Sequence, residues 1–141
     1  MGRILGFDYG RARIGIAASD ERKIIASPIG ICPKLKSDAN TFKEIQKKIE
    51  PLFPVELLVV GLPLLLNGKE GDMALEAKKF AEALSAFLKI PCALLDERLS
   101  SCQMDRLMKE GNLSRKQRAG KIDTLCATLV LQSYLDLHCK L

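Results

Sequence analysis

Four acidic residues interrupt or directly follow apolar segments: Asp8 inside the run ILGFDYG, Asp96 and Glu97 after CALL, and Asp123 inside KIDTLC. Buried acids that lie close together repel one another, which costs free energy unless a cation neutralises them. Hard divalent cations prefer oxygen ligands, and Mg²⁺ typically uses a few carboxylates together with water and substrate phosphate. If the fold brings these acids together, the pattern predicts a Mg²⁺ or Mn²⁺ site.

Such a site has a characteristic chemistry. Two ions about 4 Å apart activate a water molecule on one side of a phosphodiester and stabilise the leaving oxygen on the other. A basic segment between the acids would hold the flanking phosphates, mostly without reading bases. Its basic residues are Arg98, Arg106, Lys109, Arg115, Lys116, Arg118 and Lys121. We therefore expect a nucleic-acid substrate, although a solvated basic loop with no partner explains the charge equally well.

Each acid, taken alone, also has a structural explanation. Asp8 could shape a hairpin turn, and Glu97 could form a surface ion pair with Arg98. Asp123 could open a helix, because the positive end of the helix dipole favours an anion in the first turn. The functional interpretation depends on the acids converging in space.

The hydrophobic pattern predicts strands and helices that could bring them together. We expect strands at residues 2–10, 13–20, 23–32, 55–63 and 90–98, and helices at 37–53, 73–89, 100–111 and 122–140, with basic loop 112–121 before the last helix. Close spacing predicts that the first three strands are antiparallel, with Pro28 at an edge or bulge. Alternation with helices predicts that the last two strands are parallel. Ligands of such sheets gather at the carboxyl ends of parallel strands, which Asp8 joins if its strand neighbours the fourth.

The overall composition restricts the class of protein. The chain of 141 residues fits one domain, residues 1–141, with a net charge of +5. No apolar run approaches the roughly 18 residues of a membrane span, and the N-terminus has no signal-peptide layout. We expect a cytoplasmic protein without membrane contact. The five cysteines lack a C-x-x-C pair, which favours reduced thiols, and the single histidine, His138, gives little basis for zinc.

Four blocks of the sequence resemble, in order, the signature blocks of the YqgF/RuvX family. They are DYGRARIGIAASD, VVGLP with NGKEG, DERLSS, and GKIDTLCATLVLQSYL. The resemblance covers nearly the whole chain. It implies a ribonuclease H-like α/β fold: a mixed five-stranded sheet, with three antiparallel N-terminal strands and two parallel strands, and helices on both faces.

The resemblance also implies a function and a set of site residues. Asp8, Glu97 and Asp123 match the family's catalytic and metal-binding acids, whereas Asp96 precedes the matching Glu and should point the opposite way. The implied activity is that of a hydrolase, a metal-dependent nuclease that matures the 5′ end of pre-16S ribosomal RNA, using Mg²⁺ or Mn²⁺ with two ions when substrate is bound. The residues expected to bind nucleic acid are Arg11, Arg13, Arg98, Arg115, Lys116, Arg118 and Lys121. Ala12 replaces a lysine that is usual in the first block.

Three alternatives stay open at this point. The first is a Holliday junction resolvase acting on branched DNA, which should be a two-fold dimer; the sequence shows no obvious dimerisation helix, so we expect a monomer or weak dimer. The second is a nucleotide-binding domain of the actin, sugar-kinase and Hsp70 type, which would need a second domain around the nucleotide. The third is a non-catalytic RNA- or ribosome-binding module.

Overall fold

The computed structural model describes residues 2–65, 67–99 and 115–139, except for the side chains of residues 99 and 115–124. Within this part of the chain the strands are β1 (Arg3–Tyr9), β2 (Arg13–Ser19), β3 (Ala26–Pro33), β4 (Val55–Leu62) and β5 (Cys92–Asp96). They form a five-stranded sheet in the order β3-β2-β1-β4-β5. The first three strands pair antiparallel, and β4 runs parallel to both β1 and β5. The structure therefore confirms the mixed sheet and the parallel contact between the first and fourth strands.

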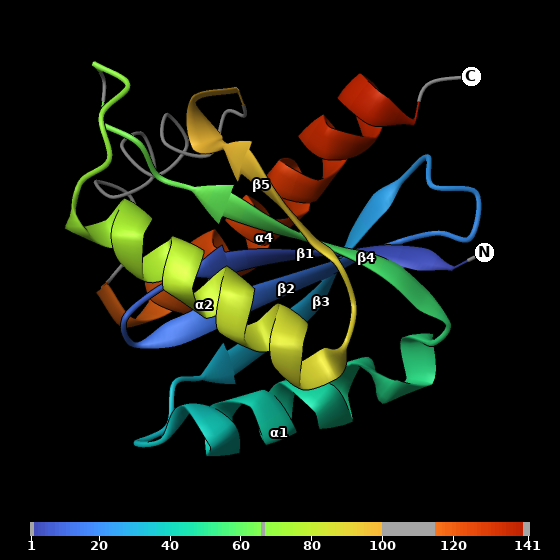
Figure 1. Ribbon diagram of the computed structural model, residues 1–141, viewed down its shortest axis with the longest axis horizontal. Helices are drawn as coiled ribbons and strands as arrows, with labels where there is room; N and C mark the ends of the chain where they lie inside the picture. The colour runs from blue at the N-terminus through green and yellow to red at the C-terminus, as the bar shows by residue number, and fades with distance from the viewer. Residues whose placement is uncertain (1, 66, 100–114, 140–141) are drawn as a thin grey trace.

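Helices cover both faces of this sheet, which gives three layers (Figure 1). The described helices are α1 (Asp38–Ile49), α2 (Asp72–Leu88), α4 (Arg115–His138) and two 3₁₀ turns, η1 (Glu50–Leu52) and η2 (Glu97–Leu99). One apolar cluster joins the sheet to α1 and α2, and includes Phe7, Ile45 and Phe80. A second joins the opposite face to α4, and includes Ile4 and Leu131.

Helix α4 packs directly against the backbone of β1 because Gly6 has no side chain. A Cβ atom placed on Gly6 would lie 2.6 Å from Cβ of Leu131 and 3.0 Å from the carbonyl oxygen of Ala127. Real Cβ atoms essentially never make a contact as short as the first of these. The glycine thus sets the distance between α4 and the centre of the sheet.

Strand β3 is an edge strand with an irregularity, as Pro28 predicted. Ile16 pairs with Gly30 whereas Ala17 pairs with Pro28, so Ile29 is an extra residue in β3. An inserted residue of this kind is a β-bulge, and bulges and proline are both typical of sheet edges.

The last helix differs from the sequence-based expectation. It begins at Arg115, seven residues before the predicted start, so the predicted basic loop 112–121 is wrong from residue 115 onward. Arg, Lys, Gln and Ala have high helix propensity, and the single glycine at 120 costs only about 1 kcal/mol, so a polar segment of this composition can extend a helix. The predicted helix at 100–111 lies outside the described residues. Asp72 is the first residue of α2 and not its N-cap, which is Gly71.

The cysteines follow the expectation only in part. Cys32, Cys92 and Cys139 carry free thiols. Cys126 is disulfide-bonded, so the expectation of reduced thiols is wrong for this residue. In the described part of the chain, no helix is both long and apolar enough to cross a membrane.

Candidate active site

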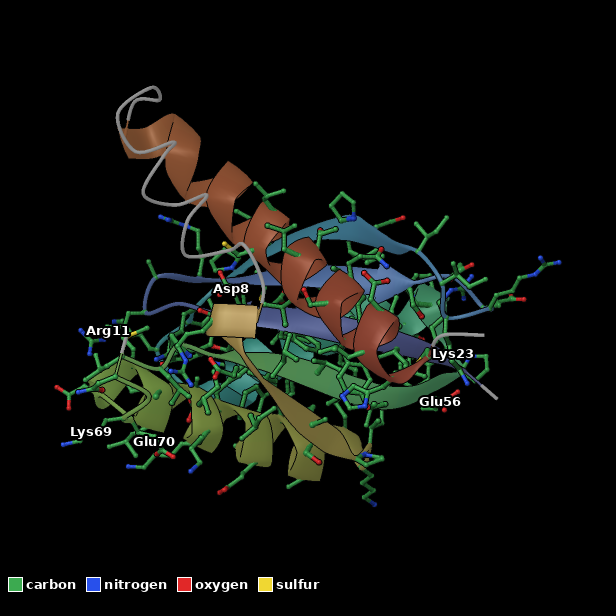
Figure 2. The ribbon with its side chains drawn as sticks, turned by 90° about the horizontal axis from the view of Figure 1, so that it is seen from above. Asp8, Arg11, Lys23, Glu56, Lys69 and Glu70 are labelled. Carbon is green, nitrogen blue, oxygen red and sulfur yellow. The ribbon has the colours of Figure 1, made fainter. Side chains whose placement is uncertain are left out.

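Asp8 is a buried acid in the centre of the sheet, with only 1% of its surface exposed. It lies in β1, where it pairs with Gly15 of β2. Side chains alternate along a strand, and Ile4 and Gly6 of β1 contact α4 whereas Phe7 packs on the opposite face. Asp8 therefore points to the face of the sheet that α4 covers (Figure 2). Asp8 thus lies within the strand pairing, before the hairpin turn.

Glu97 is equally buried, with 1% of its surface exposed, and its side chain packs against the backbone of β4 at Gly61. A Cβ atom placed on Gly61 would lie 2.5 Å from Oε1 of Glu97, 3.0 Å from its Cγ and 3.0 Å from Cγ2 of Val130 in α4. Gly61 thus provides the space that the Glu97 carboxylate occupies, on the α4 side of the sheet. This burial excludes a surface ion pair as the reason for Glu97.

The strand register brings Asp8 next to the same glycine. Phe7 pairs in parallel with Val60, so the residues that follow them, Asp8 and Gly61, lie side by side at the ends of adjacent strands. Neighbouring strands are about 4.8 Å apart, and in-register parallel neighbours point to the same face. Two buried carboxylates therefore share the carboxyl-terminal rim of the parallel strands, where ligands of α/β sheets bind.

Asp123 is placed on α4 by the backbone alone, since its side chain lies outside the description. The residue is four positions before Ala127, so both lie on one face of α4, and Ala127 is the residue that meets Gly6. It is the ninth residue of α4, two turns from the helix start, where a helix dipole has little effect. The dipole explanation for Asp123 is therefore wrong. Among the described side chains, no group of three His, Cys, Asp or Glu residues could hold a metal ion.

Asp96 faces away from this pair and binds Arg98. Oδ2 of Asp96 accepts hydrogen bonds from Nη2 and Nε of Arg98 at 2.7 and 3.0 Å, and Oδ1 accepts one from the Arg98 backbone N–H at 2.9 Å. The Arg98 guanidinium lowers the pKa of the Asp96 carboxyl group, and the carboxylate raises the pKa of Arg98. Asp96 and Glu97 thus have different surroundings, as strand alternation predicts.

Arg11 forms an ion pair that the sequence did not reveal. Its Nη2 and Nε donate to Oε2 of Glu76 in α2 at 2.7 and 3.0 Å. The hydroxyl of Tyr9 also donates to Glu76, at 3.2 Å, and itself accepts a hydrogen bond from Nζ of Lys34 at 2.6 Å. The bond to Arg11 is the main cause of the lowered pKa of Glu76.

The other predicted nucleic-acid-binding residues are only partly described. Arg13 begins β2, at the same end of the sheet as Asp8. Arg115, Lys116, Arg118 and Lys121 belong to the first two turns of α4, and their side chains lie outside the description. Arg115 to Lys121 therefore precede Asp123 on one helix rather than on a loop.

A cavity of about 320 Å³ lies on the opposite face of the sheet, between α1 and α2. Its lining includes Tyr9, Lys34, Phe42, Glu76 and Phe80. Because Tyr9 and Phe80 belong to the cluster under α1 and α2, this cavity is not part of the rim that holds Asp8 and Glu97.

Comparison with solved structures identifies the fold. The chain aligns with the RuvC of Thermus thermophilus, both alone and "in complex with Holliday junction substrate", with TM-scores of 0.53 and 0.54 and sequence identities of 13% and 14%. The alignments cover 96% and 98% of this chain, and 96% and 97% of those chains. At this level of identity the similarity shows the fold, which is the ribonuclease H-like α/β sheet.

The chain belongs to the RuvX family, whose model, described as "Holliday junction resolvase", matches residues 2–137. A protein of Protochlamydia amoebophila is 42% identical over 142 residues, which cover 97% of this chain and 95% of that protein. A protein of Syntrophomonas wolfei is 45% identical over 136 residues, which cover 95% and 94%. Both are named "Putative pre-16S rRNA nuclease". The family and these names indicate a nuclease, a hydrolase that acts on phosphodiester bonds.

Proposed function

We propose that this protein is a divalent-metal-dependent endonuclease that matures the 5′ end of pre-16S ribosomal RNA during ribosome biogenesis in the cytoplasm. The observation that carries the proposal is the pair of buried carboxylates, Asp8 and Glu97, on one face of the sheet beside Gly61. Buried carboxylates at 1% exposure that lie close together repel each other, and a bound cation lowers that cost.

The donor set at this rim fits a hard cation. Asp8 and Glu97 offer carboxylate oxygens, and Asp123 would add a third carboxylate from α4. His138, the single histidine, is the last residue of α4, far along the helix from Asp123. Oxygen ligands of this kind select Mg²⁺ or Mn²⁺ over zinc. When bound together with substrate, two such ions would supply an activated water and stabilise the leaving oxygen.

The chain's own residues would position the substrate. Asp8 is held by the central strand and Glu97 by its place over Gly61, so neither carboxylate depends on a long flexible loop. We propose that Arg13 and the cations of the first two turns of α4 contact phosphates on either side of the scissile bond. Arg11 would contribute when a phosphate competes with Glu76. Arg98, also predicted to contact nucleic acid, is paired with Asp96.

A Holliday junction is the second candidate substrate. The family model's description and the RuvC fold both favour it, whereas the names of the relatives favour RNA. Both substrates offer the same phosphodiester chemistry, so only a direct comparison separates them. A resolvase also needs two active sites, whereas for an RNA nuclease we expect a monomer or weak dimer.

The experiment compares the wild type with Asp8→Asn on pre-16S RNA and on a four-way DNA junction, each with Mn²⁺. We expect the wild type to cut the RNA near its 5′ end and the variant to lose this activity. The variant should stay folded, or become more stable, because it removes one of two adjacent buried charges. Cleavage of the junction alone would replace the RNA proposal with the resolvase. A variant that cuts as well as the wild type would show that Asp8 is not in the site.

A binding assay tests the non-catalytic alternatives. Replacement of Arg115, Lys116 and Arg118 by alanine should weaken RNA binding and reduce its dependence on salt, since each lost phosphate contact lowers the slope. If this triple variant abolishes function in cells while Asp8→Asn does not, the protein acts as a binding module. Tight ATP binding without nuclease activity would favour the nucleotide-binding alternative.

A further inference from the structure

Asp96 and Arg98, the residues before and after Glu97 in the chain, form an ion pair with each other. The Asp96 carboxylate accepts from the backbone N–H of Arg98 and from two nitrogens of its guanidinium. The backbone bond places Asp96 as a cap at the start of η2, the 3₁₀ turn that begins at Glu97. The ion pair is bidentate, and bidentate pairs fix orientation as well as adding energy.

This contact lies directly on both sides of Glu97 in the chain. Asp96 is the last residue of β5 and is committed to Arg98, so the next side chain must leave the strand on the other face. On that face Glu97 meets Gly61, 2.5 Å from the position of a Cβ atom, and is 1% exposed. The residues on both sides of the buried acid are thus held by one ion pair.

Arg98 also lies close to the loop between β4 and α2. A Cβ atom placed on Gly68 would lie 3.3 Å from Nη1 of Arg98, and Gly68 has a φ of +84° in its turn. The guanidinium thus lies between the Asp96 carboxylate and the Gly68 turn. It therefore lies at the end of β5 beside the loop that follows β4, the strand that carries Gly61.

We propose that Asp96 and Arg98 are positioning residues that hold Glu97 at the metal site, and that Arg98 acts through Asp96 rather than by binding substrate phosphate. The inference rests on the proposed function, because it assumes that Glu97 is a metal ligand. It revises the expectation from the sequence, which assigned Arg98 to nucleic acid and gave Asp96 no role.

The two roles for Arg98 predict opposite results for Asp96→Ala. If Arg98 contacts phosphate, removal of its carboxylate partner frees the guanidinium and lowers KM for RNA. If the pair positions Glu97, kcat falls while KM and the salt dependence of binding stay unchanged. Residues that orient a metal ligand typically contribute 10–100-fold to activity or metal affinity, so we expect a loss of that size.

Arg98→Lys provides a second and milder test. Lysine keeps the positive charge for a phosphate but cannot reproduce the planar two-point contact with Asp96. We expect Arg98→Lys to show the same fall in kcat as Asp96→Ala, with KM unchanged. The matched control is Glu70→Ala, which breaks the Glu70–Lys78 ion pair at similar exposure in the loop before α2 and should match the wild type.

Two further measurements do not depend on cleavage. Binding of Mn²⁺ to the free protein should weaken 10–100-fold in Asp96→Ala and not in Glu70→Ala. In the metal-free protein, the amide resonance of Gly61 should move in Asp96→Ala and Arg98→Lys, because Glu97 leaves its place, and should stay fixed in the control. Thermal denaturation verifies that each variant is folded.

These readouts separate failure of the inference from failure of the proposed function. A Gly61 resonance that moves in a protein that cuts no RNA supports the positioning role and contradicts the function. An unmoved Gly61 resonance in both variants overturns the positioning role, whatever the activity. A lower KM in Asp96→Ala also overturns it, since Arg98 would then be a phosphate contact.

Discussion

The most direct test of the site changes a residue that has no functional group. In Gly61→Ala the new methyl group would lie 2.5 Å from Oε1 of Glu97, and 3.0 Å from both its Cγ and Cγ2 of Val130. Ordinary contacts of a Cβ atom are 3.4–4 Å, so the Glu97 carboxylate must move by about 1 Å or more. The substitution displaces a proposed metal ligand and leaves its chemistry unchanged.

The expected loss follows from this displacement. A misplacement of about 1 Å at a reacting centre can cost about 100-fold in rate, or about 2.7 kcal/mol of transition-state stabilisation. Stability should change much less. Alanine is favoured over glycine in a strand by about 0.5–1 kcal/mol, which partly offsets an overpacking cost of about 1–3 kcal/mol.

Single-turnover cleavage of pre-16S RNA with saturating Mn²⁺ measures the effect, and thermal denaturation checks the fold. The matched control is Gly71→Ala at the start of α2, where the nearest atom to the new methyl group is Cδ2 of the Leu65 side chain, at 3.3 Å. In a Glu97→Gln background, Gly61→Ala should cause no further loss, because both changes act on the same carboxylate. A folded Gly61→Ala protein that cuts at the wild-type rate would refute the assignment of Glu97 as a ligand.

Three other predictions concern the fold. Gly6→Ala should lower Tm by several degrees, because its methyl group would lie 2.6 Å from Cβ of Leu131 and overpacking costs about 1–3 kcal/mol; an unchanged Tm would mean that α4 is not held at this distance. Burial raises the pKa of Cys92 to about 11, so iodoacetamide at pH 8 should modify this thiol roughly 100-fold more slowly than an exposed one, and rapid labelling would contradict its burial. The hydrogen bond from Lys23 holds the pKa of Glu56 below its usual value of 4.5, so the ion pair stabilises the fold above that pH and its contribution is lost as the pH falls through the lowered value. Glu56→Gln should therefore cost about 0.2–1 kcal/mol at pH 7 and less at acidic pH, and an equal Tm difference at both would contradict this linkage.

The sequence was sufficient for the sheet because each strand had a clear local signal. Short spacings forced the first three strands to be antiparallel, and four consecutive aliphatic residues at 57–60 marked a strand buried on both faces. The parallel contact between β1 and β4 then placed Asp8 at the rim. Strand alternation also predicted that the side chains of Asp96 and Glu97 point to opposite faces, although the sequence does not show their partners.

Other features depended on contacts between distant residues. The glycine at 61 was visible as a break in an aliphatic strand, but the carboxylate that fills its space comes from 36 positions later in the chain. The pair of Arg11 and Glu76 joins residues 65 positions apart, and no local pattern marks either as a partner. The start of α4 is not marked in the sequence, because the polar residues that precede the apolar stripe suit a loop but also favour a helix.

The two close approaches, at Gly6 and at Gly61, matter for anyone who would transplant this constellation into another scaffold. The acids alone would be an incomplete graft. A recipient sheet would also need glycine at two positions, one where the helix packs against the strand and one where the glutamate side chain lies over the backbone. Without both, the transplanted carboxylates would be forced apart or pushed into solvent.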